Sequence, residues 1–380
     1  MKLINDIFAT KALFFIMAFS IGLWTIRIPT IRDQIQTDYL GIGYLMVTFS
    51  VGSIIAMLLT NTLLISISSK TILIYASLSN WLLWLFVPFV KDLQTFMFLA
   101  FLFGVCFGLF EICINLQATK IENREKRSMM SGFHAFWSLG VLMGSFLTSL
   151  FLQWDISIFL NILTYITIML PINILFCLKL KEDKKTLDND KKSIFFIWPI
   201  LIFLLAIIAM ANVLTEGSVD SWGALYMKDF IKVSGFSIGI ATISFNIFMV
   251  LGRIYGDAFR DRLGVYRLLL ILMFLTILSL IILINFNTIL SSIFGFAILG
   301  LGTSSIVPMA YSLVSKIKGV DSGVGITIIS IAVYGTFIGA PASLGLLANF
   351  YGINNIFTPI LIIFILLLVP IRIFKDEFKL

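Results

Sequence analysis

The chain has little charge and almost no histidine. Asp, Glu, Lys and Arg make up 12% of its 380 residues, 59% of the residues are hydrophobic, and the mean hydropathy is +1.05. Soluble globular domains carry roughly 25% charged residues, so this composition excludes that class. Apolar runs of about 20 residues recur, which is the length of helix that crosses a bilayer. Runs such as "ILIFLLAIIAMA" do not alternate between apolar and polar residues, which excludes a transmembrane β-barrel.

The sequence also lacks the groups that most enzymes need. Residues 235–239, "GFSIG", match the G-x-S-x-G pattern of a nucleophile elbow, and a serine nucleophile needs a base. The single histidine, His134, is expected near the cytoplasmic face, whereas Ser237 is expected near the outer face. The sequence has no metal-binding motif and no phosphate-binding loop, so we expect no cofactor, no direct use of ATP and no enzyme activity. The three cysteines lie in apolar runs and are interpreted as packing residues.

Charged and turn-rich stretches divide the sequence into twelve predicted membrane spans. The N-terminal apolar run is too long for a cleaved signal peptide and is taken as the first of them. The predicted fold is therefore an all-α membrane protein with twelve transmembrane helices. The predicted spans are about residues 8–31, 41–66, 70–90, 94–119, 128–152, 156–178, 194–218, 236–256, 266–285, 289–315, 322–348 and 354–374.

The basic residues indicate the orientation in the membrane. An even number of spans places both termini on one side of the membrane. If that side is the cytoplasm, most of the 27 Lys and Arg, including Arg253, are cytoplasmic. The outer side then has only Arg27, Arg32, Lys91, Lys228 and Lys232. This is the positive-inside pattern of a helical membrane protein. The excess of basic residues therefore reflects topology and does not indicate nucleic-acid binding.

The two halves of the chain resemble each other. The charged stretch "KLKEDKKTLDNDKKS" (179–193) lies at the midpoint and is predicted to be a cytoplasmic linker between six-helix bundles at 1–178 and 194–380. Lys120 and Lys316, and Trp24 and Trp222, are separated by nearly the same number of residues. A duplicated six-helix unit is a common plan of secondary transporters.

Three stretches carry a resemblance to a known family. The stretch "GRIYGDAFRDRLGVYR" (252–267) resembles the loop between the second and third helices of a half in the major facilitator superfamily. The resemblance implies a conformational role for this loop. "FEICINLQA" (110–118) and "GFHAFWSLG" (132–140) are similar to the fucose-permease branch and its uncharacterised bacterial inner-membrane relatives. The loop residues concerned are Asp257, Asp261, Arg262, Gly264 and Arg267; Asp257 stands where the family usually has glycine.

A few ionisable residues fall inside the predicted spans, where a charge costs roughly 2.5–3.5 kcal/mol even on lenient scales. Glu111 is expected about 13 Å from the cytoplasmic Lys120, near the middle of the bilayer. The resemblance implies that this glutamate couples transport to protons. Arg27 is expected to reach either Glu111 or Glu216. The alternative is that Glu111, Arg27 and Asn115 form a static clasp between helices. Asn115, one turn beyond Glu111, is expected to bond to it or to the solute.

The remaining site candidates are weaker. Glu216 is expected near the outer end of its span, because "EGSVDSW" (216–222) suggests a helix break; a solvated rim is the alternative. Trp24, Trp222 and Tyr311 are candidates for cavity walls, although ordinary packing explains aromatic residues equally well. Four Gly-x3-Gly pairs, beginning at Gly104, Gly140, Gly252 and Gly335, are expected to allow close helix approach. Pro308 is expected to bend its span.

These features predict a secondary transporter that moves a small polar organic solute across the bacterial inner membrane by alternating access, coupled to protons. We expect a monomer surrounded by lipid. A weaker likeness to exporters that protect producers of microcin-type antibiotics keeps a second possibility open, an efflux pump giving resistance or self-immunity. A membrane sensor without transport activity is the remote alternative.

Overall fold

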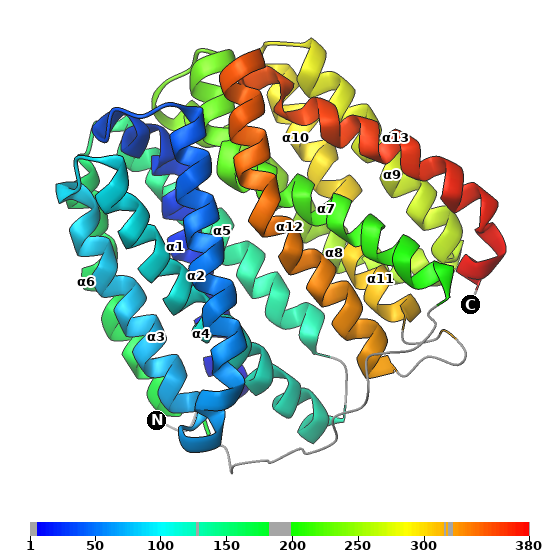
Figure 1. Ribbon diagram of the computed structural model, residues 1–380, viewed down its shortest axis with the longest axis horizontal. Helices are drawn as coiled ribbons and strands as arrows, with labels where there is room; N and C mark the ends of the chain where they lie inside the picture. Colours follow the sequence, from blue (N-terminus) through cyan, green and yellow to red (C-terminus); the bar gives the residue numbers. More distant parts are fainter. Residues whose placement is uncertain (1–5, 127–128, 182–198, 315–316, 318–321, 380) are drawn as a thin grey trace. The chain divides into compact units, whose positions relative to one another are not determined.

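The computed structural model describes residues 6–126, 129–181, 199–314, 317 and 322–379, and these residues are almost entirely helical (Figure 1). Within them, twelve helical segments are long and apolar enough to cross a membrane. This confirms the predicted all-α fold with twelve spans. The chain separates into two compact units. Most of the linker predicted at 179–193 lies outside the described residues.

The N-terminal unit is built from six membrane spans. Its helices are α1 (Asp6–Gln34), α2 (Tyr39–Ser66), α3 (Ser69–Leu83) with the 3₁₀ turn η1 (Trp84–Phe89), α4 (Leu93–Glu125), α5 (Met130–Gln153) and α6 (Ile158–Lys179). Asp38, Ser68, Asp92 and Ser157 cap α2, α3, α4 and α6 by accepting a bond from a backbone N–H of the first turn.

A short segment from the second half of the sequence packs on this N-terminal unit. It is the 3₁₀ turn η3 (Gly235–Gly239), which lies against the end of α5. The N–H of Phe236 donates to the side chain of Gln153 at 3.0 Å, and the ring of Phe236 meets that of Phe146 edge-on. Gln153 lies 19 residues along α5 from His134, about 28 Å. The serine of the G-x-S-x-G match, Ser237, is therefore far from the histidine.

The C-terminal unit contains the remaining helices. They are α7 (Ile200–Leu225), which continues as one π-helical turn η2 (Tyr226–Phe230), α8 (Ile240–Leu263), α9 (Val265–Asn285), α10 (Ile289–Thr303), α11 (Ile306–Val314), α12 (Ser322–Tyr351), η4 (Ile353–Phe357), α13 (Thr358–Ile373) and η5 (Lys375–Lys379). Helix α7 packs on α12, α11 and α8, and α10 packs on α8 and α9.

Small residues bring helices together at three of the four predicted glycine pairs. A methyl group added to Gly104 would overlap with the carbonyl oxygen of Phe49 on α2, and one added to Gly140 would overlap with that of Phe15 on α1. Gly252 faces the side chain of Ser304. At Gly335 an added methyl group would meet no described atom within 4 Å. The prediction of close helix approach is therefore wrong for this last pair.

The tenth span is broken in the middle. Helix α10 ends at Thr303 and α11 begins at Ile306, with a turn at Ser304 and Ser305 between them. Pro308 has no N–H, so it cannot donate to the carbonyl four residues earlier, that of Ser304. This agrees with the expected bend and leaves a backbone acceptor inside the span.

Candidate functional site

Arg27 of α1 is almost completely buried, with 2% of its surface exposed. Its Nε donates to Oδ1 of Asn161 at 2.9 Å, and its Nη2 donates to the carbonyl oxygen of Ile156 at 2.8 Å. Asn161 lies in the first turn of α6, and Ile156 lies just before that helix. The guanidinium therefore joins α1 to the beginning of α6, in place of the predicted pairing with Glu111 or Glu216.

Depth explains why Arg27 does not meet Glu111. The side chain of Gln34 donates to the carbonyl of Val90, so the end of α1 and the beginning of α4 lie at the same face. Arg27 is seven residues from Gln34, about 10 Å, whereas Glu111 is eighteen residues from Leu93, about 27 Å. The two charges thus differ in depth by about 17 Å, too far for direct contact.

Exchange of Arg27 for lysine tests this anchoring role. A lysine ammonium cannot hold two acceptors in the fixed geometry of a guanidinium. We expect Arg27→Lys to lower the free energy of unfolding by about 2–4 kcal/mol, because each buried acceptor left unbonded costs about 1–3 kcal/mol. Thermal unfolding of the purified protein in detergent measures this. Arg262→Lys, at an exposed arginine near the end of α8, is the control and should change stability little.

Glu111 lies well inside α4. Its Oε1 accepts a hydrogen bond from Nδ2 of Asn115 at 3.0 Å, and the same Nδ2 donates to the Glu111 backbone carbonyl at 2.8 Å. Phe110, Cys113 and Ile114 on the adjoining face are fully buried in the apolar core. Glu111 and Asn115 are only partly buried, so the carboxylate is at the edge of this core.

Helix α7 runs without a break through the stretch that was expected to interrupt it. It continues to Leu225 and then, through η2, to Phe230. Glu216 is fourteen residues from that end, about 21 Å, and therefore lies deep in the span. The expectation of a helix end near Glu216 is wrong. The stretch has no proline, and Thr215 and Ser218 satisfy their hydroxyl groups by donating to backbone carbonyls one turn earlier.

Glu216 is held by two donors. Nδ2 of Asn212, one turn earlier on α7, donates to its Oε1 at 2.7 Å. Nη2 of Arg253 on α8 lies 3.4 Å from its Oε2. Arg253 was expected in a cytoplasmic loop, but α8 continues to Leu263 and the residue falls within the span Gly235–Gly256. It is therefore one of the charges inside the membrane.

Arg253 also contacts the broken tenth span. Its Nε lies 3.4 Å from the carbonyl oxygen of Ser304, the acceptor that Pro308 leaves without its helical partner. One cation thus connects α7, α8 and the α10–α11 turn. The sequence contained a signal for this contact, because a proline four residues after Ser304 predicts a free carbonyl. The partner of that carbonyl could not be found from spacing alone.

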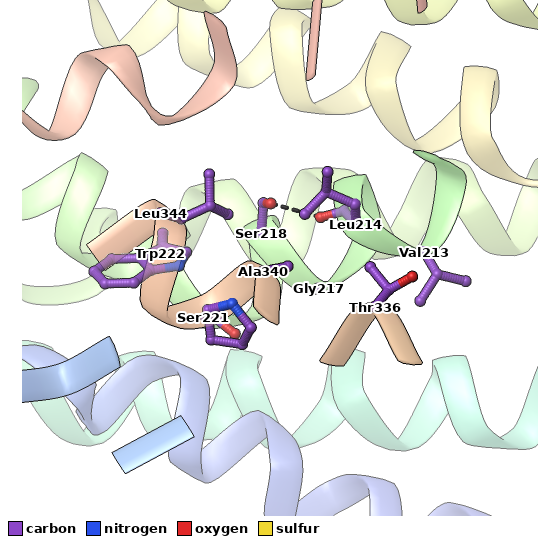
Figure 2. A pocket seen from close by; sticks show the side chains of 10 residues that line it. Val213, Leu214, Gly217, Ser218, Ser221, Trp222, Thr336, Ala340 and Leu344 are labelled. Atoms are coloured by element: carbon purple, nitrogen blue, oxygen red, sulfur yellow. Dashed lines mark hydrogen bonds between the residues drawn. The ribbon is translucent and has the colours of Figure 1, made fainter. Parts of the chain in front are cut away.

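The predicted aromatic residues occupy separate places. Trp24 of α1 packs on Phe96 of α4, with ring centroids 6.2 Å apart. Trp222 is fully buried and lines a cavity of 20 Å³ between α7 and α12 (Figure 2). This volume suits one water molecule rather than an organic solute. The hydroxyl oxygen of Tyr311 lies 3.1 Å from the hydroxyl oxygen of Ser330 on α12.

The predicted conformational loop is short, because α8 includes most of it. Gly264, with φ of 75°, is the turn between α8 and α9. Asp261 pairs with its neighbour Arg260 at 3.3 Å. Arg262 and Arg267 are exposed, and the side chain of Asp257 lies outside the described part of the chain.

An ion pair between Arg124 and Asp6 lies at the end of the N-terminal unit where α1 begins and α4 ends. Nη1 and Nη2 of Arg124 lie 2.6 and 3.0 Å from Oδ2 and Oδ1 of Asp6, which joins the end of α4 to the beginning of α1. This hydrogen bonding raises the pKa of Arg124. Glu122 accepts from the N–H groups of Met129 and Met130 and so caps α5. These contacts are structural, and no sequence motif indicates them.

The described residues form twelve candidate membrane spans in two units, some of them with charged side chains, and this arrangement is typical of secondary transporters. The Major Facilitator Superfamily model matches residues 12–230 and 201–379. The chain belongs to the major facilitator superfamily, and it is a multi-pass bacterial membrane transporter of small molecules.

Proteins similar in sequence include two transporters and one membrane protein. An uncharacterised MFS-type transporter of Yersinia pestis is 26% identical over 356 residues, which cover 92% of this chain and 90% of the relative. An uncharacterised transporter of Sinorhizobium fredii is 23% identical over 87% of each chain. The membrane protein MosC of Rhizobium meliloti is 22% identical over 90% of this chain and 83% of its own.

Solved structures show the same fold. A mutant of the nucleoside transporter NupG superposes with a TM-score of 0.77 at 13% identity, covering 99% of this chain and 100% of that one. A bacterial homologue of the human lysosomal transporter Spinster, in an inward-facing and occupied conformation, has a TM-score of 0.73 at 11% identity and covers 97% of both chains. At these identities the likeness concerns the fold alone.

Proposed function

We propose that this protein is a proton-coupled secondary transporter that moves a small polar organic solute across the bacterial inner membrane. The observation that supports it most directly is Glu111, a carboxylate deep in α4 that is only partly buried and accepts a bond from Asn115. A carboxylate inside a membrane span is costly and commonly belongs to an ion pathway. The two units move against each other by alternating access, with both termini cytoplasmic and the protein acting as a monomer in lipid.

Coupling requires that the proton affinity of Glu111 differs between the outward-open and inward-open states. Asn115 stabilises the ionised carboxylate through its N–H donor. Entry of the solute or of water beside this pair changes that stabilisation, so the proton is bound in one state and released in the other. Arg27 takes no part in this step, since its described bonds anchor α1 to α6.

The solute is identified first. Purified protein is screened for thermal stabilisation by sugars, nucleosides and small antibiotics; nucleosides are included because NupG, a transporter of the same fold, is named for them. A ligand that binds the native protein but not the unfolded chain raises the free energy of unfolding in proportion to the logarithm of its concentration. Weak ligands are therefore detectable at high concentration. An antibiotic hit would favour the efflux alternative.

Proton coupling is then measured in proteoliposomes with the solute so found. An imposed pH gradient should drive accumulation of the solute above its external concentration, and a protonophore should abolish it. The direction of the gradient that gives accumulation distinguishes symport from antiport. Equilibration that never exceeds the external concentration under any gradient would contradict the proposal.

A further inference from the structure

Helix α7 carries a second carboxylate beside Glu216. Asn212, Glu216 and Asp220 follow each other at intervals of four residues and therefore share one face of the helix. Glu216 and Arg253 both act electrostatically on Asp220. If both carboxylates were ionised, two negative charges would face one guanidinium, and the group would have an uncompensated negative charge inside the membrane. One added proton makes this group neutral.

The hydrogen bonds indicate which carboxylate binds that proton. Both oxygens of Glu216 lie within reach of a donor, one from Asn212 and one from Arg253. Oδ1 of Asp220 is buried and meets no hydrogen-bonding partner among the described residues. An ionised oxygen buried without a donor is strongly unfavourable. The bonding therefore favours an anionic Glu216 and a protonated Asp220.

Among the described residues, the helices that pack on α7 carry few other charges. Helices α10, α11 and α12 contain no charged residue, and α13 has only Arg372, in its last turn. The phenol of Tyr226 donates to the carbonyl of Leu283, and that of Tyr311 bonds Ser330. On α8, the charged residues other than Arg253 lie nearer the end of the helix. The arrangement of Asp220, Glu216 and Arg253 thus determines the local charge.

A further buried acceptor lies on the same face. Asn212 has no exposed surface, and while its Nδ2 donates to Glu216, its Oδ1 meets no partner among the described residues. Together with Oδ1 of Asp220, it gives α7 two unbonded acceptor oxygens on either side of Glu216. Each of these acceptors can accept a hydrogen bond from a water molecule.

We infer that Asp220 is a second proton-exchange site, in the C-terminal unit, whose loss of a proton to water draws Arg253 away from the Ser304 carbonyl. The inference extends the proposed proton coupling without depending on Glu111. When the Asp220 carboxylate forms, its charge competes with Glu216 for the guanidinium. The contact between α8 and the α10–α11 turn then loosens. Proton exchange on α7 is in this way connected to the bend in the tenth span.

The lengths of the two ion pairs agree with this role. The Arg124–Asp6 pair, with contacts of 2.6 and 3.0 Å, has the short geometry of strong charge-assisted bonds. Arg253 instead lies 3.4 Å from both Glu216 and Ser304. Longer contacts are weaker, so Arg253 can change partners at a smaller cost than Arg124.

Infrared spectroscopy of the purified protein tests the inference without a solute. Protonated carboxyl groups absorb at frequencies distinct from ionised ones, so a pH titration should show a carboxyl component in the wild-type protein. We expect Asp220→Asn to lose this component and Asp220→Glu to shift it. Glu111→Gln should leave it in place. Asp92→Asn is the control, because hydrogen bonds from Thr95 lower the pKa of that exposed carboxyl group and asparagine still caps α4.

Two results would overturn the inference. One is a wild-type titration without any carboxyl component across the physiological pH range. The other is a component that stays unchanged in folded Asp220→Asn and Asp220→Glu protein. Thermal unfolding of each variant shows whether it is folded. A titrating Asp220 in a protein that does not accumulate its solute would refute the proposed coupling while leaving Asp220 as a proton site.

Discussion

Glu111→Gln should abolish proton-driven accumulation and leave exchange of solute across the membrane intact. Glutamine has nearly the shape of glutamate, and its carbonyl oxygen can still accept the bond from Asn115. It cannot bind and release a proton. The variant should therefore fold and bind solute, but both states of the transporter would have the same charge at this position.

The expected effect is large and easily measured. For one coupled proton, a gradient of one pH unit can drive about tenfold accumulation, since a factor of ten corresponds to about 1.4 kcal/mol. In proteoliposomes the variant should reach only the external concentration under that gradient. Counterflow of labelled against unlabelled solute should proceed as in the wild-type protein.

The matched control is Glu125→Gln on the same helix. Glu125 lies at the end of α4 beside Arg124, outside the span, so accumulation should persist. If Glu111→Gln accumulates solute like the wild-type protein, the proton must be bound elsewhere, and Asp220 becomes the leading candidate. Loss of both accumulation and counterflow would instead indicate that Glu111 is needed for solute binding or for the conformational change.

The sequence predicts the fold of this protein well because membrane spans depend on composition over about 20 residues. Spans such as that at 94–119 need no knowledge of their neighbours, since every backbone group in a membrane helix is satisfied within the helix. Boundaries are less certain where polar residues occur inside a span. The stretch 216–222 looked like a break because it contains Glu216 and Asp220, yet α7 continues through it.

The partners of the intramembrane charges could not be predicted in the same way. That Glu111 bonds Asn115 follows from their spacing on one helix. The contacts of Arg27 with Asn161, and of Arg253 with Glu216, join residues far apart in the sequence. They depend on the depth and rotation of packed helices, which a single sequence does not give. Arg253 was assigned to a loop because a basic residue near a predicted span end is usually cytoplasmic.

The second large effect is expected at the Arg253–Glu216 pair. The side chains are 19% and 24% exposed, so both charges are largely removed from water. Arg253→Met leaves the Glu216 carboxylate without its cation, and removal of one partner of a buried pair costs about 3–5 kcal/mol. Glu216→Gln should cost less, because the remaining Arg253 still has the Ser304 carbonyl as an acceptor. The double variant has no unpaired charge and should be more stable than Arg253→Met alone.

A double-mutant cycle gives the energy of this interaction. The wild-type protein, the two single variants and the double variant are unfolded in mixed detergent micelles, and the free energies of unfolding are compared. We expect a coupling energy of about 1–3 kcal/mol, the range found for residues in direct contact. The cycle assumes that neither single variant forms new contacts.

Arg260 and Asp261 provide a matched control. Their nitrogen and oxygen atoms lie 3.3 Å apart, close to the 3.4 Å of Arg253 and Glu216, but Asp261 is 70% exposed. Exposed pairs contribute about 0–1 kcal/mol, so the same cycle at this pair should give almost no coupling. Equal coupling energies at the two pairs would show that burial adds nothing to the Arg253 contact. In that case Arg253 would be too weakly held to link the charge of α7 to the bend between α10 and α11.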